Sequence, residues 1–286
     1  MEIPGYALVT GGGQLTTVDP TASGIGKASC HAFAREGSGG ILVADINLKG
    51  AQETVDAIRS VATHAGFRAE AIHLDVSSED SVKAAVSRMK SLFGLLSILI
   101  VPIDQIVKVP GATFDPIASA SFSDFKRLLE INVHGTFLVT SLVSAAMKTQ
   151  DRKPVHPQQP ARGTTRGAIV NLASVSSYIS VPSMVQYTTS KHAVLGITRT
   201  AAYDHVADGI RVNCVCPSWT DTPMVQTAME VVPGLERLMV SGIPMGRLCT
   251  PEEVADTVLY LCSPRSSFTT GTGVIMDGGM SLGAQT

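Results

Sequence analysis

The sequence lacks the features that mark several common classes of protein. Its formal net charge is only −2 and its isoelectric point is near 6.4, which gives no electrostatic reason to expect binding to nucleic acid or to an anionic membrane. The most apolar stretch, residues 92–103, is too short to span a bilayer. The first residues include an early acidic residue and only a short apolar run, unlike a signal peptide. We therefore expect a cytoplasmic protein whose partner is a small molecule.

Cysteine is scarce and is poorly spaced for chemistry. The five cysteines are odd in number, and no two of them form a C-x-x-C pair. We expect reduced, buried thiols with no part in a metal site or a disulfide. They are Cys30, Cys214, Cys216, Cys249 and Cys262.

Apolar residues, by contrast, are plentiful. A chain of 286 residues that is 44% hydrophobic can bury one large core, and it shows no internal repeat, so residues 1–286 are expected to form a single domain. In the first hundred residues, short apolar runs alternate with helical patterns. With right-handed crossovers, this alternation predicts an α/β fold with a doubly wound parallel sheet. The predicted strands are 6–9, 41–44, 69–74 and 97–101, and the predicted helices after the first one are 52–65 and 79–93.

A glycine-rich loop joins the first strand to the first helix. Three glycines, from Gly11 to Gly13, follow the strand, and Ser23-Gly24-Ile25-Gly26 opens the helix. A strand, a glycine loop and a helix start together make a pyrophosphate site, because the helix start offers free N–H groups and the positive end of its dipole. We expect Gly11, Gly13, Ser23 and Ile25 to contact a dinucleotide cofactor.

Two carboxylates end neighbouring strands beside this loop. Asp45 can accept hydrogen bonds from both hydroxyls of an adenosine ribose and would repel a 2′-phosphate, so it favours NAD over NADP. The other interpretation of Asp45 is a solvent-facing carboxylate at a strand end. Asp75 can hold the adenine edge or can merely cap the loop that follows it.

The residues best suited to proton transfer lie between Asn171 and Val194. Tyr187 and Lys191 are four apart, so on a helix they would share a face, and the ammonium would lower the pKa of the phenol. A phenol with a lowered pKa can act as a general acid or base. Ser174 follows a predicted strand and can hydrogen-bond a substrate oxygen. This set of residues predicts proton transfer to a carbonyl or from an alcohol.

Two more segments add candidate site residues. A long helical pattern over 125–147 carries Asn132 among apolar residues, where a buried amide has a structural or a proton-relay role. A predicted strand over 210–215 runs into the loop 217–223, which should face the cofactor and supply contacts from Thr220 and Thr222.

The remaining segments are expected to complete the domain. Residues 149–166 read as a solvated loop. Residues 223–248 are rich in Met and Val and form a small lid, which either covers a bulky apolar substrate or packs internally. A helix over 251–261 and a strand over 273–276 follow.

With these residues assembled, the chain resembles the short-chain dehydrogenase/reductase family over nearly its whole length. The matching features, in order, are the glycine loop, Asp45, Asn132, Ser174, the Tyr187-x-x-x-Lys191 pair and the Asp277-Gly278-Gly279 turn. The resemblance implies a Rossmann sheet of seven strands, a nicotinamide cofactor and reversible alcohol–carbonyl oxidoreduction. It also implies a homotetramer or homodimer, often paired through the helices that contain Asn132 and Tyr187.

The resemblance also implies a role for each catalytic residue. Tyr187 is the acid/base, and Ser174 orients and polarises the substrate oxygen. Lys191 binds the nicotinamide ribose and lowers the pKa of Tyr187, while Asn132 holds a water that links Lys191 to solvent. Hydride moves between the nicotinamide and the carbonyl carbon, so the cofactor supplies the redox chemistry.

The chain departs from the family pattern at three places. Nine residues, Gln14 to Ala22, interrupt a glycine loop that normally reads TGxxxGxG, and they would either bulge from the loop or displace the pyrophosphate. Residues Val101 to Asp104 lie where an Asn-Asn-Ala-Gly turn usually approaches the adenosine. Ser218 stands where a glycine is usual.

Two hypotheses of function follow. The first is an NAD(H)-dependent dehydrogenase or ketoreductase acting on a hydrophobic secondary alcohol or ketone. Because the loop 149–166 resembles insertions in fungal members of the family, it suggests fungal secondary metabolism. The alternative, motivated by the altered cofactor half, is a redox-impaired family member that acts as a binding or scaffold subunit or as a non-redox cyclase.

Overall fold

The main strands form one parallel sheet, seen here in a computed structural model of the chain. The structure describes residue 3 and residues 5–13, 24–101 and 116–283. Within these residues the sheet has seven strands in the order β3-β2-β1-β4-β7-β8-β9, and every neighbouring pair is parallel, as the sequence and the family resemblance predict. The strands are β1 (Tyr6–Thr10), β2 (Gly40–Asp45), β3 (Arg68–His73), β4 (Ile98–Val101), β7 (Gly167–Leu172), β8 (Ile210–Pro217) and β9 (Gly273–Met276).

The strand order reverses at β1, and such a reversal predicts a ligand site at the carboxyl ends of the neighbouring strands. β1 pairs with β2 on one side and with β4 on the other. In open α/β sheets, ligands bind outside the carboxyl ends of the strands at such a reversal. The loops that follow β1, β7 and β8 all begin at these carboxyl ends, so the predicted site residues converge there.

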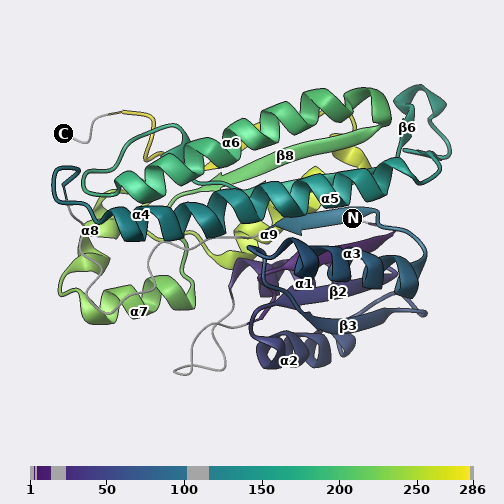
Figure 1. Cartoon of the computed structure of the whole chain (residues 1–286), viewed down its shortest axis with the longest axis horizontal. Coiled ribbons are helices and arrows are strands. Elements are labelled where there is room, and N and C mark those ends of the chain that lie inside the picture. Colours follow the sequence, from purple (N-terminus) through teal and green to yellow (C-terminus); the bar gives the residue numbers. More distant parts are fainter. Residues whose placement is uncertain (1–2, 4, 14–23, 102–115, 284–286) are drawn as a thin grey trace.

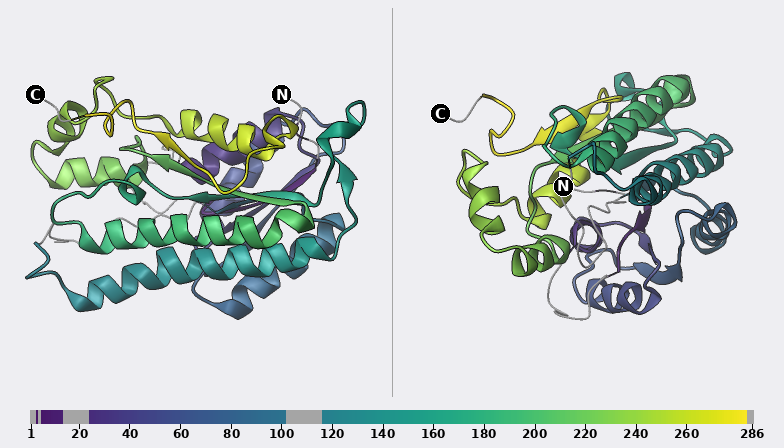
Figure 2. Two further views of the ribbon diagram at one scale, coloured as in Figure 1. Left: turned by 90° about the horizontal axis from the view of Figure 1, so that it is seen from above. Right: turned by 60° about the vertical axis from the view of Figure 1, so that its left-hand side comes forward.

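Two helical layers cover the sheet (Figures 1 and 2). Successive residues of β1 show why: Ala7 and Val9 point into the core on one face, and Leu8 points into the core on the other. The helices α1, α2 and α9 pack on the first face, whereas α3, α5 and α6 pack on the second. These helices are α1 (Ile25–Arg35), α2 (Leu48–Arg59), α3 (Glu79–Phe93), α5 (Thr136–Lys148), α6 (Val185–His205) and α9 (Pro251–Cys262).

Capping residues set the helix boundaries. The predicted bounds of α3 are confirmed, because the Ser78 hydroxyl accepts from the Ser81 N–H and Gly94 ends the helix at a φ of 73°. The predicted bounds of α2 are wrong by several residues. That helix begins at Leu48, since the Asn47 side chain accepts from the Gly50 N–H, and it ends at Arg59.

The long predicted helix is interrupted by a π-helical segment. It consists of α4 (Phe122–Leu129), the π segment η1 (Glu130–Gly135) and α5. By length and composition Phe122–Lys148 could cross a membrane, but a core helix of a soluble protein passes the same test. Val139 and Val143 of α5 are fully buried in the core shared with α3, β4 and α6.

The remaining connections are partly ordered. The segment 149–166, predicted as a loop, contains an antiparallel hairpin of β5 (Lys153–Pro154) and β6 (Thr164–Thr165). The expected lid contains α7 (Pro223–Val231) and α8 (Leu235–Ser241), which pack against each other. Short 3₁₀ turns are η2 (Pro160–Arg162), η3 (Val175–Ser177), η4 (Val206–Asp208) and η5 (Pro264–Ser266).

The lid has a small core of its own. Val225, Leu235 and Met239 are buried together, and Trp219 and Met229 pack against them. Two of the lid methionines therefore pack internally, as one of the two expectations had it, whereas Met245 is 71% exposed.

The cysteines are free thiols. Cys30, Cys214, Cys216 and Cys262 are buried, and Cys249 is half-buried. The Sγ atoms of Cys214 and Cys216 are 3.9 Å apart, which is hydrogen-bond contact and not a covalent bond.

Candidate active site

Ser174 lies just beyond the carboxyl end of β7. Its backbone is extended and it caps η3, because its Oγ accepts from the Ser176 N–H at 3.1 Å. The same Oγ donates to the Pro217 carbonyl at 3.4 Å, which links the ends of β7 and β8. The side chain is only 6% exposed, so a substrate oxygen that reached it would meet a fixed hydroxyl in a site largely free of water.

Tyr187 and Lys191 lie on the first turns of α6 and face the same way. The Lys191 Nζ is 5.5 Å from the centre of the Tyr187 ring and donates to the Leu172 carbonyl at 2.9 Å. Lys191 is fully buried, and Tyr187 is 6% exposed. The 5.5 Å separation places the Lys191 Nζ within cation–π distance of the Tyr187 ring, so the two side chains share one buried face of α6.

Asn132 lies in the π segment η1 and is fully buried. Its Nδ2 donates to the Ser190 hydroxyl at 3.2 Å, and that hydroxyl donates to the Tyr187 carbonyl at 2.8 Å. The backbone carbonyl of Asn132 accepts from the Thr136 hydroxyl. Single π turns within α-helices are frequent at functional sites. The π turn directs the Asn132 side-chain amide at Ser190, which lies between Tyr187 and Lys191 in the sequence of α6.

Two buried serines support this set, and sequence reasoning missed both. Ser190 connects Asn132 to α6, and the Ser177 hydroxyl donates to the Lys191 carbonyl at 2.6 Å. The signal that could indicate them is the presence of several small polar residues within the segment 171–194. The motif spacing alone does not indicate which of these serines are buried.

The glycine loop is closely packed against the start of α1. A Cβ built on Gly26 would lie 2.2 Å from the Gly11 carbonyl oxygen, so only glycine lets the helix approach the loop this closely. Gly11 itself has a φ of 62°, which glycine adopts readily. Ile25 is the first residue of α1, whereas Ser23 lies outside the described residues.

The first turn of α1 has the character of an anion site. Gly24 caps it without a side-chain hydrogen bond, and the first turn holds no acidic residue. Among the described residues, no atom lies within 4 Å of a Cβ built on Gly24. The Thr10 hydroxyl at the end of β1 is buried and has no hydrogen-bond partner within the described part of the chain. As far as the described residues go, a helix start with no side-chain cap fits the pyrophosphate of a dinucleotide.

Asp45 is buried and holds the end of the glycine loop. Its Oδ2 accepts from the Gly13 N–H and its Oδ1 from the Asn47 N–H, both at 2.8 Å. Burial raises the pKa of this carboxyl, while the backbone N–H groups of Asn47, Gly13 and Ile46 and the charge of His73 act in the opposite direction. With 5% exposure, the solvent-facing interpretation is wrong. Each oxygen keeps a further lone pair that a ribose hydroxyl can use.

The other expected cofactor residues have local hydrogen bonds. Asp75 Oδ1 accepts from the N–H and the hydroxyl of Ser77, so this carboxylate caps the turn before α3. Thr222 accepts from the Val225 N–H and caps α7, and Thr220 donates to the Ser218 carbonyl. Both threonines follow β8 at the carboxyl edge, on the same side of the sheet as Ser174. Gln14–Ala22 and Pro102–Asp104 lie outside the described residues.

Comparison with known proteins identifies the family. A protein-family model described as enoyl-(acyl carrier protein) reductase matches residues 21–281. A short-chain dehydrogenase, fogB of Aspergillus ruber, is 48% identical, and the alignment covers 99% of each chain. The chain belongs to the short-chain dehydrogenase/reductase family. It is therefore an oxidoreductase of a family that binds an NAD(P) nucleotide and acts on small molecules.

More distant members of the family share its length and fold. The 2,5-dichloro-2,5-cyclohexadiene-1,4-diol dehydrogenase of Sphingobium indicum is 36% identical over 95% of each chain. The crystal structure of levodione reductase superposes with a TM-score of 0.81 at 27% identity, over 98% of each chain. The seven-stranded sheet and its two helical layers are thus those of a short-chain dehydrogenase/reductase.

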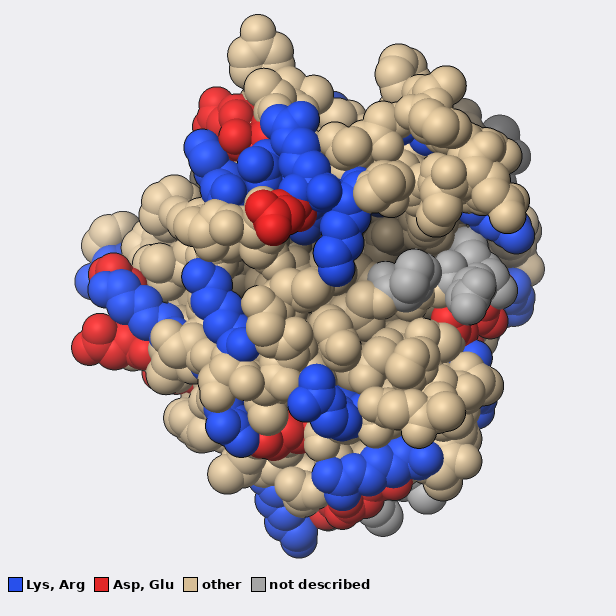
Figure 3. All heavy atoms as spheres, turned by 90° about the vertical axis from the view of Figure 1, so that its right-hand side faces the viewer, with Lys and Arg blue, Asp and Glu red and all other residues tan. Residues whose placement is uncertain are grey.

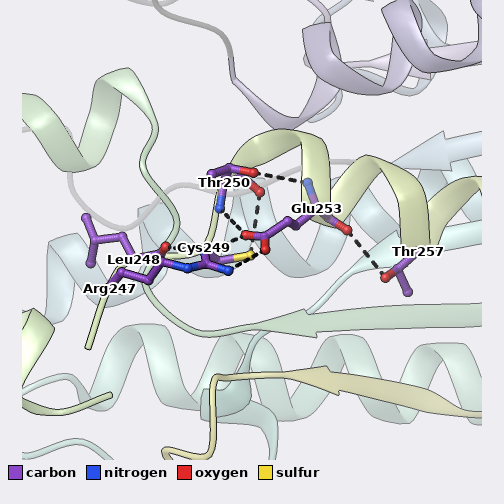
Figure 4. Close-up of polar contacts among 6 residues, drawn as sticks. All are labelled: Arg247, Leu248, Cys249, Thr250, Glu253 and Thr257. Carbon is purple, nitrogen blue, oxygen red and sulfur yellow. Dashed lines mark hydrogen bonds and ion pairs between the residues drawn. The ribbon is translucent and has the colours of Figure 1, made fainter. Parts of the chain in front are cut away.

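In this short-chain dehydrogenase/reductase, the loop after β8 is tied to the start of α9. The Cys249 N–H donates to the Trp219 carbonyl, and the Asp221 N–H donates to the Cys249 carbonyl. Figure 4 shows how the α9 side is fixed: Thr250 and Glu253 form a capping box, and Arg247 binds both oxygens of Glu253 at 2.9 and 2.6 Å. These contacts hold the two ends of the lid segment together beside Thr220.

Replacing Glu253 by Gln tests the charged half of this tie. The Arg247 guanidinium lowers the pKa of Glu253 to about 2, so its contribution to stability is fully present above the ordinary carboxyl pKa and is lost as the pH falls through about 2. Glu253→Gln keeps an oxygen for the Thr250 N–H but loses the ion pair. At pH 7 we expect it to lower the free energy of unfolding by about 0.5 kcal/mol, because the pair is exposed.

Urea unfolding at several pH values measures this effect. The difference between the wild-type protein and the variant should shrink as the pH is lowered from about 5 toward 3. Glu252→Gln is the matched control, because Glu252 also lies in the first turn of α9. Equal losses in the two variants would show that Arg247 has no specific effect.

Proposed function

We propose that this short-chain dehydrogenase/reductase uses NAD(H) to interconvert a secondary alcohol and a ketone on a hydrophobic small molecule, in fungal secondary metabolism. The observation that carries the proposal is the fully buried Lys191, whose Nζ lies 5.5 Å from the Tyr187 ring centre, with Ser174 at the end of the adjacent strand. Burying an ammonium is costly unless its charge is used or balanced. Stabilising a phenolate during proton transfer is such a use.

The proton-transfer chemistry follows from these residues. The nicotinamide, when bound, accepts or supplies the hydride. In alcohol oxidation, Tyr187 as phenolate takes the hydroxyl proton while the electron pair of the carbinol C–H bond leaves as hydride, and the carbonyl forms. Ser174 turns its hydroxyl from the Pro217 carbonyl to donate a hydrogen bond to the same oxygen, and Lys191 stabilises the phenolate. In reduction, the steps reverse. Asn132, joined to α6 through Ser190, positions this helix and relays protons toward Lys191.

The cofactor contacts remain those expected from the sequence. Gly11, Gly13, Ser23 and Ile25 would hold the pyrophosphate at the start of α1, Asp45 the adenosine ribose and Asp75 the adenine. Thr220 and Thr222 would lie against the nicotinamide, beside Tyr187 and Lys191. Within the described residues, the start of α1 has no side-chain cap and the Thr10 hydroxyl has no partner, and both observations support this placement, since they leave polar groups for a ligand to satisfy.

The substrate, the oligomer and the location are part of the same proposal. The fungal relative supports a fungal setting, and the exposed lid side chains Leu238 and Met245 support a hydrophobic substrate. We place the protein in the cytoplasm as a homotetramer or homodimer paired through α5 and α6, where Phe137 and Tyr203 are 56% and 85% exposed. Sedimentation of the purified protein as a monomer at micromolar concentration would contradict the oligomer.

Deuterium transfer tests the reaction itself. NADH carrying deuterium at C4 is incubated with the protein and a panel of cyclic and polyketide-like ketones, and the products are analysed by mass spectrometry. We expect one deuterium on the carbinol carbon of the accepted ketone. No transfer to any ketone, together with binding of the same ketones, would favour the binding subunit or the non-redox cyclase.

Cofactor choice gives a separate prediction at Asp45. Asp45→Ala removes the carboxylate that would accept from the ribose hydroxyls and repel a 2′-phosphate, so the preference for NADH over NADPH should fall by about tenfold or more. The variant also loses the hydrogen bond from Gly13, and Asp45→Asn, which retains one acceptor oxygen, separates the two effects. The measurement is kcat/KM with each nucleotide. A wild-type preference for NADPH would contradict the role of Asp45.

A further inference from the structure

A hollow lies at the amino ends of the strands, whereas Ser174 lies at their carboxyl ends. It has a volume of about 560 Å³ and is lined where β1, β4, β7 and β8 begin, by Gly5, Ile98, Gly167 and Arg211 among others. Since β7 is six residues long, the amino ends lie roughly 20 Å from the carboxyl ends. The hollow is therefore separate from the candidate active site, and its volume is within the range of small-molecule sites.

Positive charge gathers around this hollow. Among the described lining residues, four are basic and only one, Asp151, is acidic. Figure 3 looks onto this end of the molecule and shows several Lys and Arg side chains there, with Asp and Glu side chains among them. The four basic residues are Lys90, Lys153, Arg166 and Arg211.

The two arginines are held in place by neutral groups. Arg166 donates to the carbonyls of Gln150 and Asp208, at 2.7 and 2.6 Å. Arg211 donates to the carbonyls of Ser263 and Thr269, at 3.3 and 3.2 Å. Each guanidinium has five N–H donors, and neither forms an ion pair with a carboxylate of the described residues. Burial lowers the pKa of Arg211, which shows that its charge is poorly solvated.

The strand register places Arg166 and Arg211 near each other along the backbone. Ala168 pairs with Arg211 across β7 and β8, and Arg166 lies two residues before Ala168. Lys153 pairs across the β5–β6 hairpin with Thr165, the residue before Arg166. The lining residues that the structure describes hold four cations and one carboxylate, and like charges around one hollow repel one another. An anion bound among them would relieve the repulsion.

The walls between the charges are partly apolar. Ile3, Leu95, Ile98 and Val155 also line the hollow. From these observations we propose that the hollow is a binding site for an organic anion, a carboxylate or phosphate monoester with a short apolar body, distinct from the nicotinamide and substrate sites. The anionic group lies among the four basic side chains and the apolar body lies against the aliphatic wall.

Binding of simple probes to the protein tests the site. Hexanoate, hexyl phosphate and inorganic phosphate are titrated by calorimetry into the protein at low chloride concentration. At least one organic probe should bind more tightly than inorganic phosphate, and the tighter of the two identifies the preferred anionic group. The same affinity is expected when the protein is saturated with NADH. No binding at about 10 mM, or competition with NADH, would overturn the proposal.

Charge variants locate the binding. Lys90 and Lys153 take part in no hydrogen bond or ion pair of their side chains within the described residues, so Lys90→Gln with Lys153→Gln should fold normally. This double variant is expected to weaken probe binding by about tenfold. Lys49→Gln with Lys83→Gln removes the same charge from helix surfaces that do not line the hollow and should change the affinity less than about twofold. Equal losses in the two double variants would show that only net charge matters and would contradict a site in the hollow.

Discussion

Tyr187→Phe should lower kcat by about a thousandfold while leaving the affinity for NADH nearly unchanged. The substitution removes only the phenolic oxygen, which is the group assigned to proton transfer, and general acid–base catalysis contributes about 10² to 10⁴ in rate. The ring still packs where Tyr187 is buried, so the fold should be kept. Steady-state kinetics with an accepted ketone gives kcat, and calorimetry gives the affinity for NADH.

Tyr178→Phe is the matched control for this experiment. Tyr178 is four residues after Ser174, but its hydroxyl donates to the Gly273 carbonyl on β9 and does not belong to the set around Lys191. The control should keep kcat within about twofold. A Tyr187→Phe enzyme with full activity would remove Tyr187 from its proposed role.

Gly26→Ala is expected to have a similarly large effect, on cofactor binding. The new Cβ would lie 2.2 Å from the Gly11 carbonyl oxygen, so α1 or the glycine loop must move. The atoms that the Cβ would meet belong to the backbone of Gly11 and Gly12 and cannot easily move aside. The substitution should therefore lower the free energy of unfolding by about 1–3 kcal/mol. It should also weaken NADH binding by about tenfold or more, since the N–H groups of α1 leave their positions.

Gly24→Ala separates this effect from a general sensitivity of the loop. Gly24 lies two residues earlier and has a φ of −76°, which alanine adopts readily, and a Cβ there meets no described atom within 4 Å. Its free energy of unfolding should stay within about 1 kcal/mol of the wild-type value. Urea unfolding compares the two variants. Equal destabilisation would mean that the Gly26–Gly11 contact is not decisive.

Local signals in the sequence predict much of the fold. The bounds of α3 follow from Ser78 and Gly94, because each satisfies backbone groups that the helix leaves open. The buried strands follow from short apolar runs, and the parallel order follows from their alternation with helices. The sequence does not predict the start of α2, because Asn47 caps the helix at Leu48, four residues before the apolar pattern that begins at residue 52.

The candidate site is predicted less completely, for a physical reason. The spacing of Tyr187 and Lys191 fixes their common face, since both lie on one helix. The π turn at Asn132 depends on how α4 and α5 pack against α6, and no local pattern encodes that packing. Likewise, the hydrogen bond from Gly13 to Asp45 joins segments far apart in the sequence. The hollow at the amino ends arises from the starts of several strands, so it has no motif at all.

The central claim is that the glycine loop still delivers NAD(H) to Tyr187 and Lys191 despite the insertion of Gln14 to Ala22. Thermal unfolding with increasing NADH or NADPH tests it most directly, because a ligand that binds only the native state raises its stability by mass action. NADH should raise the unfolding temperature in a saturable manner, and NADPH should need a higher concentration for the same shift. No shift with either nucleotide at millimolar concentration would contradict the proposed function.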